Sequence, residues 1–150
     1  MSDSHIPAGC HAITPYLVVR GAAQAIEFYR HVFDAVEIFR LPMGEKIGHA
    51  ELQIGNSRIM LADEFPDHDA LAPAHFGGTP VSLLIYVPNV DEVFDRALAA
   101  GARLKRPLVD QFYGDRSGMV VDPFGHIWSI AMHQEDVSPK ELLRRMSQGS

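Results

Sequence analysis

The chain has 150 residues, of which 47% are hydrophobic and 21% are charged, a composition typical of one globular domain or of two small modules that share a core. The net charge of −6 and the lack of a basic stripe argue against a nucleic-acid partner, and no apolar run approaches the ~20 residues of a membrane span. Cys10 is the only cysteine and the N-terminus carries no leader pattern, so we expect a cytoplasmic protein without an intramolecular disulfide.

The first half of the chain predicts a strand, a helix and three further strands after a loose arm of about 11 residues. Apolar residues recur every three or four positions in the predicted helix, and the pair Gly55-Asn56 is a strong signal for a hairpin turn. The strands are expected at Ile13 to Val19, Val36 to Leu41, His49 to Ile54 and Ser57 to Ala62, the helix at Ala22 to Phe33, and a turn at Pro42 to Gly44.

A stretch rich in proline, glycine and aspartate, Glu64 to Pro80, separates this half from a second one and is predicted to be a linker. In the second half, Asn89 is a plausible helix N-cap, and Ser138 with Glu141 forms a capping box. The strands are expected at Val81 to Val87, Leu104 to Val109, Met119 to Val121 and His126 to Met132, with helices at Val90 to Ala100 and after Ser138.

The two halves repeat one pattern. Thr14 and Ser82 stand at matching points before the two helices, and Leu61 and Ser129 match in the later strands at the same offset of 68 residues (82 − 14 and 129 − 61). Such a duplication predicts an α+β fold of two paired βαβββ modules that form a curved mixed sheet around a cleft, with helices outside. We expect one domain over residues 11–135, with repeats at about 11–64 and 81–135, and a helical tail at 136–150.

Alternation along the strands predicts which side chains face the helices. Val81, Leu83, Ile85 and Val87 are uniformly apolar and should cover a helix, so Ser82, Leu84 and Tyr86 should face away from it. By the repeat, the open face also carries the side chains of Thr14, Tyr16 and Val18, and in the last strand those of Ile127, Ser129 and Ala131.

Several short motifs carry a family resemblance. The repeat, the helix segment Ile26-Glu-Phe-Tyr29 and the turn Asp122-Pro-Phe-Gly-His126 resemble the vicinal oxygen chelate superfamily, which includes glyoxalase I, ring-cleaving dioxygenases and bleomycin-resistance proteins. Four further motifs look most like the PhnB-like branch of this superfamily: Ile13-Thr-Pro-Tyr16, His49-Ala-Glu-Leu52, Leu61-Ala-Asp-Glu64 and Tyr113-Gly-Asp-Arg116. The resemblance implies a homodimer that binds a small organic molecule.

Glyoxalase-type members hold a divalent metal with His or Glu side chains from four strands. The resemblance places these positions at Thr14, Leu61 (give or take one residue), Ser82 and Ser129, none of which is a usual ligand. A doubly charged ion requires anionic or imidazole donors. We therefore expect no metal at the usual position and no cofactor, with binding that serves sequestration or a metal-free reaction.

A displaced metal site is the alternative. His49 and Glu51 share one face of a strand, Asp63 follows the neighbouring strand, and a His/Glu/Asp set is chemically suited to a metal-dependent lyase, isomerase or dioxygenase. The hairpin decides the geometry, because a two-residue loop places Glu51 beside Met60, whereas a three-residue loop places it beside Leu61. His49 and Glu51 could also be ordinary hydrogen-bonded strand residues or members of a metal-free polar pocket.

The predicted pocket combines these positions with a polar loop. Arg116 could bind an anionic ligand or could brace the loop through Asp115. The expected ligand-pocket residues are Thr14, Tyr16, His49, Glu51, Leu61, Asp63, Ser82, Tyr86, Tyr113, Arg116 and Ser129. Whether a reaction is catalysed stays open, and a scaffold whose dimer surface matters is a third possibility.

Overall fold

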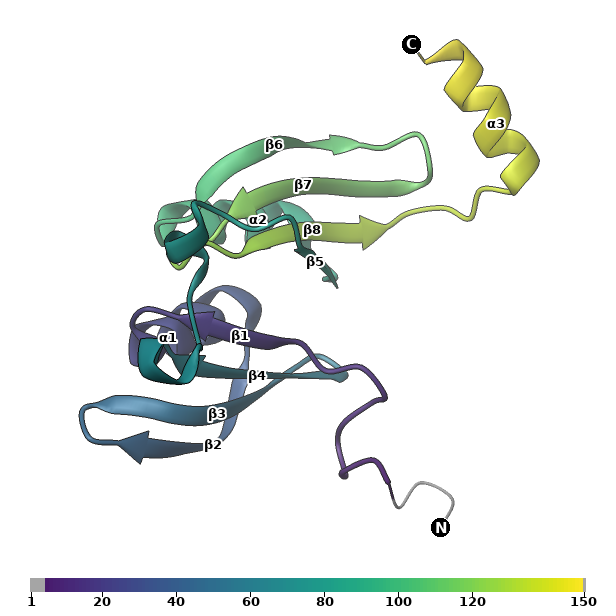
Figure 1. The fold of residues 1–150 in the computed structure, drawn as a ribbon. Helices are drawn as coiled ribbons and strands as arrows, with labels where there is room; N and C mark the ends of the chain where they lie inside the picture. The colour runs from purple at the N-terminus through teal and green to yellow at the C-terminus, as the bar shows by residue number, and fades with distance from the viewer. Residues whose placement is uncertain (1–4, 150) are drawn as a thin grey trace. The chain divides into compact units, whose positions relative to one another are not determined.

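The computed structural model describes residues 5–149, in two compact units whose boundary lies between Thr79 and Pro80. Residues 1–4 of the predicted arm and Ser150 of the predicted tail lie outside the described residues. Each unit holds a four-stranded sheet with a helix against it (Figure 1). The predicted α+β fold with two βαβββ modules is confirmed. No helix in the described part of the chain has the length and apolar character that crossing a membrane requires.

The first unit contains one helix and one mixed sheet. Its sheet has the order β1-β4-β3-β2, in which β1 runs parallel to β4 and the other neighbours are antiparallel. The elements are β1 (Tyr16–Val19), α1 (Ala22–Phe33), β2 (Val36–Met43), β3 (Lys46–Ile54) and β4 (Ser57–Asp63), followed by the short helical turns η1 (Pro66–His68) and η2 (Pro73–Phe76).

The second unit repeats this arrangement and adds a C-terminal helix. Its sheet has the order β5-β8-β7-β6, and β5 again runs parallel to its neighbour β8. The elements are β5 (Ser82–Tyr86), α2 (Val90–Ala99), β6 (Arg103–Asp110), β7 (Asp115–Val121), β8 (Ile127–His133) and α3 (Pro139–Gln148).

The core of the first unit forms where the apolar stripe of α1 meets one face of its sheet. The predicted stripe is buried, with Ile26, Tyr29 and Val32 fully inaccessible to solvent. The sheet contributes Leu52 and Leu61, which are also fully buried. Each such side chain contributes about 1.5–3 kcal/mol of burial free energy, so the α1 stripe fixes which face of the sheet is the core face.

Two predicted helix caps are present. The Asn89 side chain accepts a hydrogen bond from the Glu92 backbone N–H at the start of α2, and the Ser138 hydroxyl accepts one from the Glu141 N–H at the start of α3. These bonds satisfy backbone donors that have no partner inside the helix. The local sequence therefore sets where both helices begin.

Several predicted boundaries differ from the structure, among them the start of β3 at Lys46, three residues before the expected His49. The first strand begins at Tyr16 rather than Ile13, whose side chain is 87% exposed and has no core to enter. Pro42 lies inside β2, and the turn follows at Gly44. The strand expected from Met119 begins at Asp115, because the carboxylate of Asp115 and the other polar groups at its start find partners within the unit.

Proline interrupts an outer strand in each sheet. Pro42 lies in β2 and Pro107 lies in β6, and each of these strands pairs with only one neighbour in its own sheet. The ladder shifts register between Leu41 and Pro42 and again between Arg106 and Val109. Both positions fit the rule that proline, which lacks a backbone N–H, is tolerated at the edges of sheets.

Candidate functional site

The β3–β4 hairpin determines which side chains of the first unit share a face. Ile54 pairs with Ser57 across the two-residue turn, and Glu51 consequently lies opposite Met60. Met60 in turn lies opposite Tyr16 on β1. Opposite residues in a sheet project to the same side, so Tyr16 and Glu51 share the face that points away from α1.

Three polar side chains form a chain of hydrogen bonds on this open face. The hydroxyl of Tyr16 lies 2.8 Å from Nδ1 of His49, and Nε2 of His49 lies 2.9 Å from a carboxylate oxygen of Glu51. Tyr16 and His49 come from β1 and β3, the strands on either side of β4. Their rings lie 5.5 Å apart, and the Phe39 ring of β2 lies 5.7 Å from His49 on its other side.

The direction of these hydrogen bonds follows from the carboxylate. A carboxylate only accepts, so Nε2 of His49 carries the proton toward Glu51, and in the neutral ring Nδ1 then accepts from the Tyr16 hydroxyl. Arg58 donates to the other oxygen of Glu51 at 3.3 Å. Partial burial, and secondly the negative charge of Glu51, raise the pKa of Tyr16, so its phenol keeps its proton near neutral pH.

Asp63 has a structural role instead of the predicted role in the pocket. One carboxylate oxygen accepts the N–H groups of Gly21 and Ala22 at the start of α1, and the other accepts the N–H of Ile47 at the start of β3. The residue is 8% exposed. Asp63 lies opposite Val19 on the core face, so it cannot share an ion with His49.

The displaced metal site is therefore not assembled. His49 and Glu51 lie on the open face of the sheet and Asp63 lies on the opposite face. Among the residues that the structure describes, no group of three or more His, Cys, Asp or Glu side chains is placed to hold a metal ion. The two-residue turn of the β3–β4 hairpin places Glu51 beside Met60 and not beside Leu61, so His49 and Glu51 lie on the face opposite to Asp63.

The four family positions do not fit a divalent metal either. Leu61 is fully buried on the core face, and Met60 takes the matching place on the open face, within the one-residue tolerance of the predicted position. Ser82 and Ser129 lie on neighbouring strands of the second unit with side chains on its open face, and Thr14 precedes β1. Hydroxyl, thioether and aliphatic groups do not replace the carboxylate and imidazole donors that such an ion requires.

The second unit carries its own polar cluster, which sequence reasoning missed. The Tyr86 hydroxyl donates to Asp115 at 2.8 Å, and Nδ1 of His133 lies 2.7 Å from the other oxygen of Asp115. Nε2 of His133 lies 2.7 Å from Asp136 in the segment after β8. The β7–β8 pairing of Asp115 with His133 brings these groups together, and no local pattern in the sequence indicates it.

The charges in this cluster shift two pKa values. Hydrogen bonds to Asp115 and then to Asp136 raise the pKa of His133, although the imidazole is half exposed. The hydrogen bond to Asp115, followed by burial, raises the pKa of Tyr86. Both shifts have the same source, because a carboxylate stabilises the protonated form of a neighbouring donor.

The raised pKa of His133 predicts a pH-dependent stability. The pKa in the folded state lies above the ordinary value of 6.5, so the stabilisation is fully present below about pH 6.5 and is lost as the pH rises through the folded pKa. The melting temperature of the wild type should exceed that of His133→Gln most at low pH, and the difference should shrink as the pH rises. His11→Gln, at an exposed position, is the control. A constant difference would contradict this coupling.

Arg116 braces the second unit and does not face the open side. Its guanidinium donates to both carboxylate oxygens of Asp91 in α2 at 2.9 and 3.0 Å and to Asp110 in β6 at 3.3 Å. These bonds lower the pKa of Asp91. Arg116 therefore has the predicted bracing role, but its partners are Asp91 and Asp110 instead of Asp115. Tyr113 lies in the β6–β7 turn and is 43% exposed.

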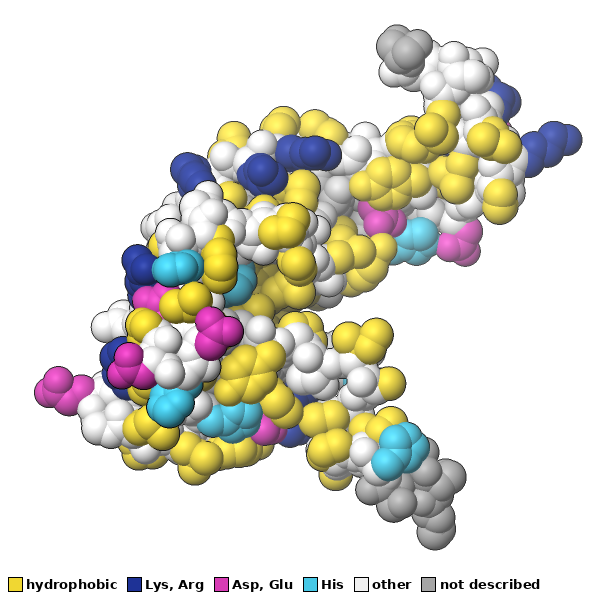
Figure 2. Space-filling view, in the orientation of Figure 1, with side chains coloured by type: hydrophobic (Ala, Val, Ile, Leu, Met, Phe, Trp, Pro, Cys, Tyr) yellow, Lys and Arg dark blue, Asp and Glu magenta, His cyan; other side chains and the backbone are white. Residues whose placement is uncertain are grey.

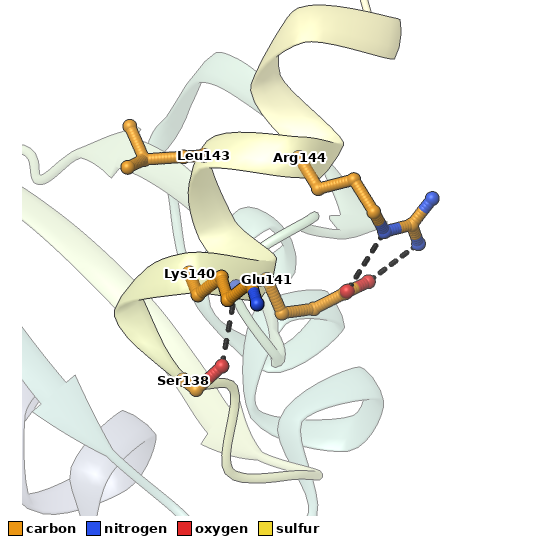
Figure 3. Close-up of a pocket in the computed structure, with 5 residues that line it drawn as sticks. All are labelled: Ser138, Lys140, Glu141, Leu143 and Arg144. Carbon is orange, nitrogen blue, oxygen red and sulfur yellow. Dashed lines mark hydrogen bonds and ion pairs between the residues drawn. The ribbon is translucent and has the colours of Figure 1, made fainter.

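The hollow at α3 is not a convincing ligand site. It is lined by Ser138, Lys140, Glu141, Leu143 and Arg144, which all come from this helix and its N-cap (Figure 3). Glu141 is already engaged by Arg144 and Arg145, and these hydrogen bonds lower its pKa to about 2. Side chains of one exposed helix cannot enclose a molecule from several sides.

Hydrophobic side chains are also exposed around α3 (Figure 2), with Leu143 and Met146 69% and 59% exposed. The side chains of Phe112 and Tyr113, in the turn before β7, are 44% and 43% exposed. Arg145 joins the helix to this turn through the carbonyl oxygen of Phe112 at 2.8 Å. Arg145 thus attaches the helix to the second unit, while Leu143 and Met146 stay largely exposed.

Comparison with known proteins identifies the type of chain. A family model described as the glyoxalase/bleomycin resistance protein/dioxygenase superfamily matches residues 10–130. A relative from Mycobacterium bovis, the uncharacterized protein Mb0911c, is 44% identical over 140 residues, which cover 91% of this chain and 92% of the relative.

Solved structures agree with this assignment. TioX from Micromonospora sp. ML1 is 26% identical with a TM-score of 0.64, and the match covers 85% of this chain and all of TioX. A PhnB protein from Bacillus cereus is 20% identical with a TM-score of 0.62, over 81% of this chain and 99% of that protein, which is a likeness of fold. The resemblance to the superfamily that the sequence motifs carry is confirmed. For the PhnB-like branch, the comparison shows a likeness of fold.

Proposed function

Because this chain belongs to the glyoxalase/bleomycin resistance protein/dioxygenase superfamily, we propose that it binds small organic molecules, each on the open face of one sheet, without a divalent metal at the usual family position. The observation that carries the proposal is the Tyr16–His49–Glu51 cluster. It places three linked polar groups and two aromatic rings on a sheet face that α1 does not cover. A few positioned polar groups among aromatic and apolar surface is the usual make-up of a ligand site.

Each unit has its own set of candidate ligand-binding residues. In the first unit, Tyr16, His49 and Glu51 face the ligand, and Thr14 lies just before β1. In the second unit, the open face carries Ser82, Tyr86 and Ser129, with Tyr113 in the adjoining turn. Leu61, Asp63 and Arg116 are left out because their side chains are buried or engaged in structural contacts.

The binding should not depend on metal. Protein treated with EDTA is screened by thermal unfolding against small aromatic compounds that carry hydroxyl or amine groups. A bound ligand raises the melting temperature by mass action, and we expect the same rise with and without EDTA. A rise that requires added Zn²⁺, Ni²⁺ or Mn²⁺ would contradict the proposal, as would saturable binding of the metal alone in calorimetry.

A designed site tests the placement of the open face in the second unit. Ser82 and Ser129 project to the same side from the parallel neighbours β5 and β8. Ser82→His combined with Ser129→Glu should therefore bind Ni²⁺ about tenfold or more tightly than either single variant, since two donors then converge on one ion. Equal affinity of the double and single variants in calorimetry would show that these side chains do not converge.

We also propose that the chain forms a homodimer in the cytoplasm. The edge strand β2 supports the dimer, because its apolar side chains Val36, Leu41 and Met43 are 55–60% exposed within this chain. Exposed apolar groups gathered on one strand are typical of a surface that a partner covers. Sedimentation at increasing protein concentration tests the dimer, and Leu41→Lys should shift the equilibrium to the monomer.

A further inference from the structure

The hydrogen bonds of the open face in the first unit have a chemical consequence that goes beyond binding. Tyr16 uses its only proton in the bond to Nδ1 of His49, and both ring nitrogens of His49 are engaged within the cluster. The free lone pairs of the Tyr16 oxygen are therefore available only as acceptors. A ligand that contacts Tyr16 must bring its own hydrogen-bond donor.

The hydrogen bond between Tyr16 and His49 also provides an acceptor for a proton that a ligand donates to Tyr16. A neutral imidazole accepts a proton at Nδ1, and the resulting imidazolium keeps its Nε2–H bond to the Glu51 carboxylate. Arg58 offsets the charge of Glu51 before the transfer. The pair formed afterwards, a ligand anion and an imidazolium, adds no net charge to this part-buried surface.

We propose that Tyr16, His49 and Glu51 form a proton relay that deprotonates a phenol or enol bound on the open face of the first unit; this inference rests on the binding function proposed above. In one step the O–H bond of the ligand breaks as its proton bonds to the Tyr16 oxygen. The original O–H bond of Tyr16 breaks as that proton bonds to Nδ1 of His49. The products are the ligand anion, a neutral Tyr16 and an imidazolium beside Glu51.

The relay avoids a free tyrosinate. The raised pKa of Tyr16 makes its anion costly, but a concerted transfer never forms that anion, because the phenol gains one proton as it loses the other. Tyr16 is thus the group that touches the ligand and His49 is the base. Glu51 is a positioning residue that fixes the ring so that Nδ1, and not Nε2, faces Tyr16.

The rings around His49 indicate the class of ligand. Phe39 and Tyr16 both lie within 6 Å of the His49 ring, at 5.7 and 5.5 Å between centroids, and Phe39 is 40% exposed. A flat unsaturated molecule stacks on such surfaces more favourably than a saturated one. An aromatic hydroxyl or an enol combines this shape with an acidic O–H donor.

The test uses para-nitrophenol, whose phenolate absorbs visible light, and its methyl ether para-nitroanisole, which has no proton to give. Binding of both probes is measured by calorimetry, and the phenolate fraction of bound para-nitrophenol is measured by absorbance at one pH. The ratio of bound phenolate to bound phenol should be about tenfold higher in the wild type than in Tyr16→Phe or His49→Gln, equivalent to one pKa unit. Para-nitroanisole should bind the wild type and Tyr16→Phe equally.

The outcomes separate the relay from the binding site. Failure of both probes to bind would overturn the proposed binding face and the relay with it. Binding of both probes with the same phenolate ratio in the wild type and Tyr16→Phe would overturn the relay alone. His11→Gln is the matched control, because His11 is an exposed histidine outside the cluster, and it should leave the ratio unchanged.

Nitrogen-15 NMR of the His49 ring tests the positioning role of Glu51. The resting wild type should show the neutral tautomer with the proton on Nε2, and Glu51→Gln should populate both tautomers. A resting imidazolium would overturn the relay, because Nδ1 would already hold a proton. An unchanged tautomer in Glu51→Gln would overturn the role assigned to Glu51.

Discussion

Replacing Asp63 with alanine is expected to lower the free energy of unfolding by about 3–5 kcal/mol, among the largest effects of any single change in this chain. The carboxylate accepts three backbone N–H groups, from Gly21, Ala22 and Ile47, at 2.8–2.9 Å. It is almost completely buried, so water cannot replace it. Alanine would leave these donors without partners and would remove a negative charge from the N-terminus of α1.

Urea denaturation followed by far-UV circular dichroism measures this loss. Asp63→Asn should be milder, because the amide keeps one acceptor oxygen, although its NH₂ group then opposes an N–H donor. Asp67→Ala, at an exposed position in η1, is the control and should change stability by less than about 0.5 kcal/mol. Equal losses in Asp63→Ala and Asp67→Ala would show that the buried carboxylate does not join α1 and β3 to β4.

Replacing Gly114 with alanine is expected to cost about 2–4 kcal/mol, the second large effect. Its φ angle of +102° strains any residue with a side chain. A Cβ atom there would also lie 2.2 Å from the backbone oxygen of Glu135. The Gly114 carbonyl accepts the N–H groups of Gln134 and Glu135, so the backbone cannot move away without breaking these bonds.

Gly55→Ala is the control that separates the cost of a positive φ angle from the cost of the steric clash expected in Gly114→Ala. Gly55 also has a positive φ, +56°, but a Cβ atom added there would meet nothing within 4 Å. This variant should cost only about 1 kcal/mol. Thermal unfolding of both variants makes the comparison, and limited proteolysis should show earlier cleavage after β8 only in Gly114→Ala. Equal melting temperatures would contradict the collision at Glu135.

Periodicity and turn chemistry predict much of this fold. The stripe of α1, the Gly55-Asn56 turn and the caps at Asn89 and Ser138 all depend on contacts a few residues apart, which a sequence displays directly. The start of β7 at Asp115 could not be predicted in this way. A polar strand end is stable there only because His133 on the neighbouring strand and Tyr86 on β5 satisfy its carboxylate.

The candidate site was predicted less completely, because it depends on register. Tyr16, His49 and Glu51 were each expected in a pocket, and the hairpin rule showed that a two-residue turn would separate Glu51 from Leu61. The sequence did not indicate that the Tyr16 side chain lies within hydrogen-bond distance of His49 two strands away. The residues Leu61 and Asp63 were misplaced because a one-residue error in register moves a side chain to the other face.

The prolines in the outer strands have a consequence for how the chain behaves when crowded. An uninterrupted edge offers a row of free amide and carbonyl groups on which an unfolded neighbour can add strand after strand, the first step toward fibres. Pro107 breaks that row near the middle of β6 and Pro42 breaks it near the end of β2, so each edge offers an added segment fewer consecutive hydrogen-bonding sites. Exchanging either for threonine would restore one backbone N–H donor to the edge, and seeded fibre growth would then become faster than in the native chain.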